Sequence, residues 1–207
     1  MNYSALVTQI KNFLEDDSTE FSDSIDAIID QAEEKIFQRL PNLPAFRQSA
    51  TGTLADGTAS YTISNARIVR NVGVTVSSNV TYLDHRVDSY LRDYWPNAST
   101  TGQPIMYSTD SASASGTTIT LAPTPNSNYS YEVEFSAPAT GLSSGNTTSW
   151  LGTNAENVLL SACLYEASAF LKAPETVTLY KSQFDEAVQL MQQEMLRDYA
   201  SEYNGGI

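Results

Sequence analysis

The sequence contains one cysteine and one histidine, and it is poor in basic residues and in long apolar runs. A single cysteine, Cys163, cannot form an internal disulfide, which excludes a disulfide-stapled fold. It lies in an apolar helical stretch, so we expect it to be buried as a small hydrophobic residue. No stretch reaches the roughly 18 apolar residues of a membrane-spanning helix. The first residues also lack a secretion signal, so we expect no membrane insertion and folding in the cytoplasm.

Basic residues are outnumbered, with 11 Lys and Arg against 24 Asp and Glu, which gives a net charge of −13. The acids gather at the ends: residues 1–48 hold nine acids and four bases, and residues 154–207 hold eight and three. Proteins that bind DNA do so largely by placing Lys and Arg on its phosphates. The composition therefore argues against a sequence-reading DNA-binding domain, although it is compatible with an acidic wall beside passing DNA.

Both ends of the chain have the apolar spacing of helices. We expect a short first helix, a second one capped by Ser22 and ended by Pro41, and a third one capped by Asn154. A fourth helix opens at Pro174. Its apolar residues repeat every three or four positions, which favours lengthwise packing against other helices: Val177, Tyr180, Phe184, Val188, Met191 and Met195.

The middle of the chain has the alternation of β-strands. Residues 129–135 are the clearest case, with aromatic and apolar residues on one face and Ser130, Glu132 and Glu134 on the other. Asp56-Gly57 indicates a hairpin between strands 51–54 and 60–63. The segments 111–118 and 141–149, rich in small polar residues, are expected to be surface loops.

These patterns predict an α+β fold, with a helical bundle formed by both chain ends and an inserted antiparallel β-rich subdomain. The expected boundaries are residues 1–48 for the N-terminal helices of the bundle and 49–150 for the insertion. Residues 151–200 are expected to supply the C-terminal helices, and residues 201–207 a flexible tail.

Candidate catalytic groups are few. Glu132 and Glu134 share a strand face at about 6–7 Å, close to the separation of glycosidase carboxylates, but two solvated acids on a wet face explain them as well. His85 lies near Asp84 and Asp88, yet a metal site needs more nitrogen or sulfur ligands than one His and one distant Cys provide. We therefore predict no catalytic, metal or cofactor site and a non-enzymatic protein.

Two other functions stay open from the residues alone. Twelve Tyr and two Trp could build a glycan-binding platform, and Tyr61, Tyr82, Tyr107 and Tyr129 all lie in strand contexts. A cell-wall hydrolase that uses Glu132 and Glu134 is the second alternative.

The order of several short motifs resembles the head-to-tail adaptor, or connector, proteins of tailed bacteriophages. These motifs are IFQRLP at 36–41, GQPIMY at 102–107, ITLAPTP at 119–125, YSYEV at 129–133, NTTSWL at 146–151 and EASAFL at 166–171. The similarity extends over most of the chain.

This resemblance implies a structural virion protein of the neck, between capsid and tail, assembled in the host cytoplasm. Family members form a dodecameric ring that binds the portal protein, holds the tail nozzle or tail-tube protein and extends the channel for double-stranded DNA, without sequence-specific DNA binding. A C-terminal extension of such adaptors reaches into the portal. Here that position is held by Tyr199, Tyr203 and Ile207, which become the candidate portal-docking residues.

Overall fold

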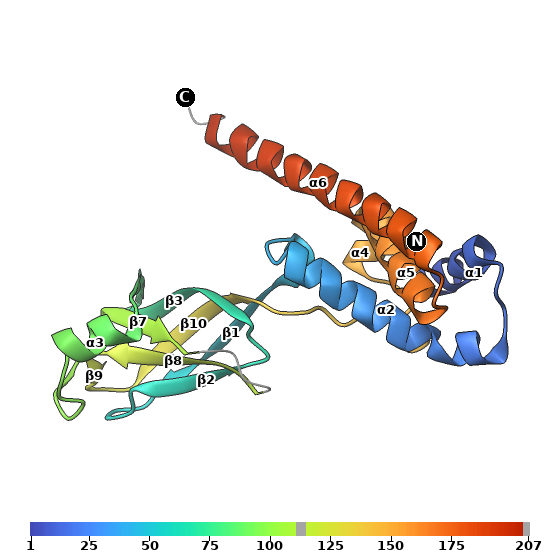
Figure 1. The fold of residues 1–207 in the computed structure, drawn as a ribbon. Helices are drawn as coiled ribbons and strands as arrows, with labels where there is room; N and C mark the ends of the chain where they lie inside the picture. The colour runs from blue at the N-terminus through green and yellow to red at the C-terminus, as the bar shows by residue number, and fades with distance from the viewer. Residues whose placement is uncertain (111–114, 205–207) are drawn as a thin grey trace. The chain divides into compact units, whose positions relative to one another are not determined.

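The computed structural model describes residues 1–110 and 115–204, and it forms two compact units (Figure 1). Unit 1 combines both chain ends, Met1–Phe46 and Pro138–Ile207, and unit 2 is Arg47–Ala137. Unit 1 is helical, and unit 2 consists of mostly antiparallel sheets, with two short parallel strand pairs and one short helix. The predicted α+β fold, with a helical bundle from both ends and an inserted β-rich part, is confirmed.

Five α-helices and one 3₁₀ turn make up the described part of unit 1. They are α1 (Tyr3–Leu14), α2 (Thr19–Arg39), η1 (Pro44–Phe46), α4 (Trp150–Asn154), α5 (Glu156–Phe170) and α6 (Pro174–Asn204).

The helix starts follow local capping chemistry, but two of them differ from the prediction. Ser18, and not Ser22, caps α2, because its side chain accepts a hydrogen bond from the Phe21 N–H. Asn154 ends α4 and does not cap α5, whose first residue follows Ala155. Ser149 caps the extra helix α4 through the Gly152 N–H at 3.0 Å. The nearest polar residue to an apolar stripe is thus not always the cap.

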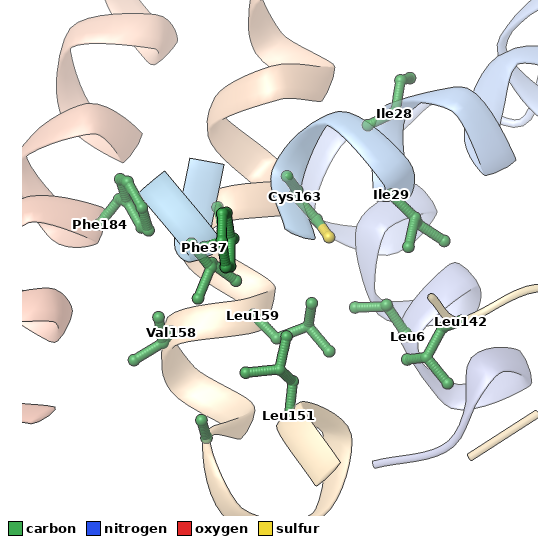
Figure 2. Packing of buried hydrophobic residues seen from close by; sticks show 14 of the residues in the cluster. Leu6, Ile28, Ile29, Phe37, Leu142, Leu151, Val158, Leu159, Cys163 and Phe184 are labelled. Atoms are coloured by element: carbon green, nitrogen blue, oxygen red, sulfur yellow. The ribbon is translucent and has the colours of Figure 1, made fainter. Parts of the chain in front are cut away.

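The core of unit 1 draws on helices from both ends of the chain (Figure 2). Leu6 of α1 and Ile29 of α2 are fully buried, as are Leu159 and Cys163 of α5. Phe184 of α6 reaches the same cluster and lies beside the Tyr165 ring, with centroids 6.5 Å apart. Burying this apolar surface supplies the main stabilisation of the bundle.

Helix α6 packs along α5 by the stripe that its spacing predicts. Tyr180, Phe184 and Val188 are buried, and Met191 and Met195 are half-buried. Helix α6 has 31 residues and α5 has 15, so α6 continues beyond its partner (Figure 1). It runs to Asn204, so residues 201–204, expected in a tail, belong to the helix.

Unit 2 contains two four-stranded sheets, ordered β1-β10-β3-β4 and β2-β8-β7-β5, and the small pair β6-β9. Its elements are β1 (Arg47–Leu54), β2 (Ser60–Ser64), β3 (Ile68–Val76), β4 (Asn79–Tyr82), β5 (Asp84–His85), α3 (Asp88–Tyr94), β6 (Thr101–Gly102), β7 (Met106–Thr109), β8 (Gly116–Ala122), β9 (Thr124–Pro125) and β10 (Tyr129–Ser136). Val72, Val133, Ile119 and Leu121 belong to the core of this unit.

The predicted hairpin at Asp56-Gly57 is wrong. Strand β1 pairs with β10 and strand β2 with β8, so the turn leads from one sheet to the other. The turn itself is present, since Gly57 has a φ of +75°. Its N–H donates to the Pro125 carbonyl, which belongs to a distant part of the chain. A turn signal reports local geometry and does not identify the strand partner.

The first and last strands of unit 2, β1 and β10, pair with each other at the point where the chain enters and leaves this unit. Arg47 pairs with Ser136, and the antiparallel register continues to Leu54 opposite Tyr129. We therefore predict that residues 47–137 fold cooperatively when produced alone, as judged by circular dichroism and urea unfolding. A fragment of residues 55–137 lacks β1 and leaves β10 with one neighbour, so it should be unfolded or aggregated. An unfolded 47–137 fragment would contradict the independence of this unit.

Candidate interaction surfaces

The predicted docking residues lie at the C-terminal end of α6. Tyr199 and Tyr203 belong to its last turns, and Ile207 lies outside the described residues. Tyr199 follows Met195 by four positions, which is the spacing of the buried stripe. The spacing of the stripe thus continues in sequence past Met195. Met195 is half-buried, and it is the last member of the stripe whose burial the structure describes.

A groove of about 410 Å³ runs between the start of α5 and the middle of α6. Its apolar lining consists of Val158 from α5 with Ala187, Leu190 and Met191 from α6. Leu190 is 59% exposed, although its neighbours Val188 and Met191 belong to the stripe that packs along α5. From the sequence alone, Leu190 is only a leucine that does not belong to the apolar stripe of α6.

The groove is acidic. Glu156, Glu186 and Glu194 line it, and the other polar lining residues are uncharged. Glu186 and Glu194 are exposed, and neither forms an ion pair among the described side chains. The charges of Glu186 and Glu194 are therefore presented to solvent, whereas Glu156 is paired with the amino group of Met1 at 3.1 Å.

The segment that returns from unit 2 to unit 1 is fixed by one half-buried carboxylate, that of Glu33. The Leu142 N–H donates to both oxygens of Glu33, at 3.2 and 3.3 Å, and the Leu142 side chain is fully buried in the core (Figure 2). A Cβ on residue 141 would overlap Glu33 Oε2 and lie 3.2 Å from Asp30 Oδ1, so Gly141 permits this approach. The expectation that residues 141–149 are only a surface loop is therefore wrong for Leu142.

Burial, helped by the neighbouring Asp30 carboxylate and opposed by the Leu142 hydrogen bond, raises the pKa of Glu33 to about 7. Asp30, Glu33 and Glu34 line a cavity of about 250 Å³ together with residues 138–141. Burial raises the pKa of the Cys163 thiol well above its usual range, and Glu33 and Glu166 add to this. Cys163 is thus a packed, unreactive thiol, as its sequence context indicates.

Glu132 and Glu134 lie on the predicted strand, β10, and hold hydrogen bonds from neighbouring strands. The Tyr82 hydroxyl donates to Glu132 at 2.9 Å, and the Asn71 amide donates to Glu134 at 3.0 Å. The pKa of Tyr82 is raised by the hydrogen bond to Glu132 and by its charge. These contacts are cross-strand pairs on a solvated face and account for both carboxylates without a reaction.

The surroundings of His85 are those of an exposed surface residue. Its ring lies 3.3 Å from Thr109 Oγ1 and 5.0 Å from the Tyr107 centroid. The two nearby acids are paired with arginines, Asp84 with Arg86 and Asp88 with Arg92. Within residues 1–110 and 115–204, no three His, Cys, Asp or Glu side chains gather in a way that could hold a metal ion.

The tyrosines proposed as a glycan platform do not form one surface. Tyr107 is buried, Tyr61 packs against Tyr131 at 6.0 Å, and Tyr129 donates to the Asn126 side chain. The sequence does not single out a separate stack on α3 and the residue after it. There the Tyr90 and Tyr94 rings are 5.9 Å apart and nearly parallel, with Trp95 next to Tyr94.

Across the described residues, every helix is too short or too polar to span a bilayer. Comparison with known families gives one result that covers nearly the whole chain: the sequence model described as SU10 adaptor protein matches residues 1–205. No curated protein matches the chain.

Proposed function

Because the chain belongs to the SU10 adaptor protein family, a family of phage head-to-tail adaptors, we propose that it forms the ring that joins the portal to the tail. Membership makes it a structural phage adaptor, a virion component of the junction between capsid and tail. The finer proposal is a dodecameric ring that binds the portal protein on one side and the nozzle or tail-tube protein on the other.

The observation that carries this proposal is the length of α6. Its apolar stripe is covered by α5 up to Val188 and half-covered to Met195, while the helix continues to Asn204. A helix that extends beyond its own bundle with a continuing stripe needs a second protein to bury it. We assign that role to the portal, through Tyr199, Tyr203 and Ile207.

The charge of unit 1 supports the proposed DNA channel. This unit contains 17 acidic and six basic residues, and unit 2 contains seven and five. A channel wall formed by unit 1 would repel DNA phosphates, so DNA would pass without adhering. Assembly in the host cytoplasm, before the tail is attached, completes the proposal.

The test is reconstitution with the purified portal protein of the same phage. We expect a stable complex with one adaptor chain for each portal subunit, visible as a second ring by electron microscopy. A ring interface repeats one pair of complementary faces around a closed circle. Absence of any complex under conditions in which the portal ring is intact would overturn the proposed function.

A double substitution tests the docking residues within that complex. Tyr199→Ala with Tyr203→Ala should weaken portal binding at least about tenfold, because buried tyrosines are frequent hot spots of interfaces. The matched control is Tyr90→Ala with Tyr94→Ala, a pair with the same spacing on the exposed helix α3. Equal affinity of both double variants in a titration would refute the assignment.

A further inference from the structure

The groove between α5 and α6 lies beside the stripe that packs into the core, and it includes one member of that stripe, Met191. Its apolar part consists of Val158, Ala187, Leu190 and Met191. Leu190 is 59% exposed and Met191 is half-buried, so a partner could cover apolar surface here. Flexible methionine side chains adapt readily to an inserted residue.

The acidic border of the groove selects the chemistry of its occupant. Glu186 and Glu194 on α6 and Glu156 on α5 stand around the apolar part. An interface with this arrangement favours a partner with apolar side chains at its centre and Lys or Arg at its edges. An acidic or neutral partner would leave Glu186 and Glu194 unpaired or repelled, since only Glu156 already has a partner, the amino group of Met1.

A second copy of this chain does not fit that description. Unit 1 has an excess of 11 acids over bases. Three of its six bases are paired with its own acids: Lys35 with Glu166, and Arg39 and Lys181 both with Asp185. Unit 2 is also net acidic, with seven acids and five bases, so either unit of a second copy would bring like charge to this border. This disfavours a second copy as the occupant of the groove and leaves the contacts between copies in the proposed ring to other faces. The occupant is therefore a different protein with a basic surface.

We propose that this groove binds a Lys- or Arg-bearing amphipathic segment of the portal protein. The inference rests on the proposed function, and it adds the chemical character of the portal segment that the groove binds. Met191 of the groove, Met195 and Tyr199 follow one another at intervals of four residues, so they share one face of α6 that leads from the groove to the proposed docking end. One partner can follow α6 from the groove to its C-terminus.

Charge reversal tests the acidic border. Glu186→Lys with Glu194→Lys should raise the dissociation constant for the portal protein about tenfold at low salt, with less loss at high salt. The control is Asp17→Lys with Asp23→Lys, two exposed acids away from the groove that change the net charge by the same amount. Equal weakening by both pairs would assign the effect to net charge and overturn the proposal.

Cysteine labelling tests the apolar part by a different readout. Cys163 is buried, so Leu190→Cys gives one exposed thiol in the groove, and Leu179→Cys gives one on the same helix outside it. We expect bound portal protein to slow maleimide labelling at position 190 at least about tenfold and to leave position 179 nearly unchanged.

The outcomes separate this inference from the proposed function. If the unmodified adaptor forms no portal complex, the proposed function fails. If the complex forms and position 190 is labelled as fast as before, the groove assignment fails alone. If position 190 becomes protected in the adaptor alone as its concentration rises, a second copy occupies the groove and the assignment also fails.

Discussion

Replacing Glu33 by Gln should raise the free energy of unfolding of unit 1 by about 3 kcal/mol at pH 9 and leave it nearly unchanged at pH 4. The carboxyl group is half-buried beside Asp30, and its pKa in the folded protein is raised to about 7. Each unit of pKa shift corresponds to about 1.4 kcal/mol, so a rise from 4.5 to about 7 costs the charged form roughly 3 kcal/mol.

The sign follows from the proton count. Between pH 4.5 and 7 the folded protein keeps the Glu33 proton and the unfolded chain releases it. The folded state binds more protons, so stability falls as pH rises through this window and is level on either side of it. Gln has the same shape, stays neutral and can still accept the Leu142 hydrogen bond. The contribution of residue 33 to the fall of stability with rising pH therefore disappears.

The two tryptophans allow the measurement to be made for unit 1 alone, because Trp150 lies in unit 1 and Trp95 in unit 2. In a Trp95→Phe background, urea unfolding followed by Trp150 fluorescence from pH 4 to 9 gives the stability of unit 1. Glu186→Gln is the control for an exposed carboxylate and should shift the curve by less than about 0.5 kcal/mol. Parallel pH curves for Glu33→Gln and the unmodified protein would refute the prediction.

The sequence predicts those features that depend on neighbours along the chain. The stripe of α6, the break at Pro174 and the two-faced strand β10 all follow from periodicity, because one repeating face must be buried. The sequence predicts the start of α2 four residues too late, because several polar residues precede its stripe and any of them could serve as the cap.

Features that depend on contacts between distant segments could not be predicted. Strand β1 pairs with β10 across the whole of unit 2, and the Asp56-Gly57 turn gives no sign of this. Leu142 is one apolar residue in a polar segment, and its burial depends on Glu33, which lies 109 positions away. The groove likewise exists only once α5 and α6 are packed together. The sequence indicates that Leu190 is off the stripe, but not what lies beside it.

Truncating Phe184 to Ala should lower the stability of unit 1 by about 3–5 kcal/mol, the usual cost of removing a buried aromatic ring. Phe184 is 3% exposed and is one of three fully packed anchors in the described part of α6, with Tyr180 and Val188. The Phe184 ring lies beside the Tyr165 ring, and the Arg39 guanidinium carbon lies 6.0 Å from the centroid of the Phe184 ring. A typical domain is stable by only about 5–15 kcal/mol, so this loss would leave α6 loosely held.

The matched control is Phe135→Ala, the same truncation in the core of unit 2, where Phe135 is 4% exposed. Trp150 fluorescence should report the loss for Phe184→Ala and Trp95 fluorescence the loss for Phe135→Ala, each with little change in the other unit. Leu190→Ala, on the exposed side of α6, should cost less than about 1 kcal/mol. Since α6 carries both proposed portal contacts, Phe184→Ala should also weaken portal binding, and Phe135→Ala should not. Equal destabilisation of both units by Phe184→Ala would show that they unfold as one, and the anchoring of α6 would then not be a property of unit 1 alone.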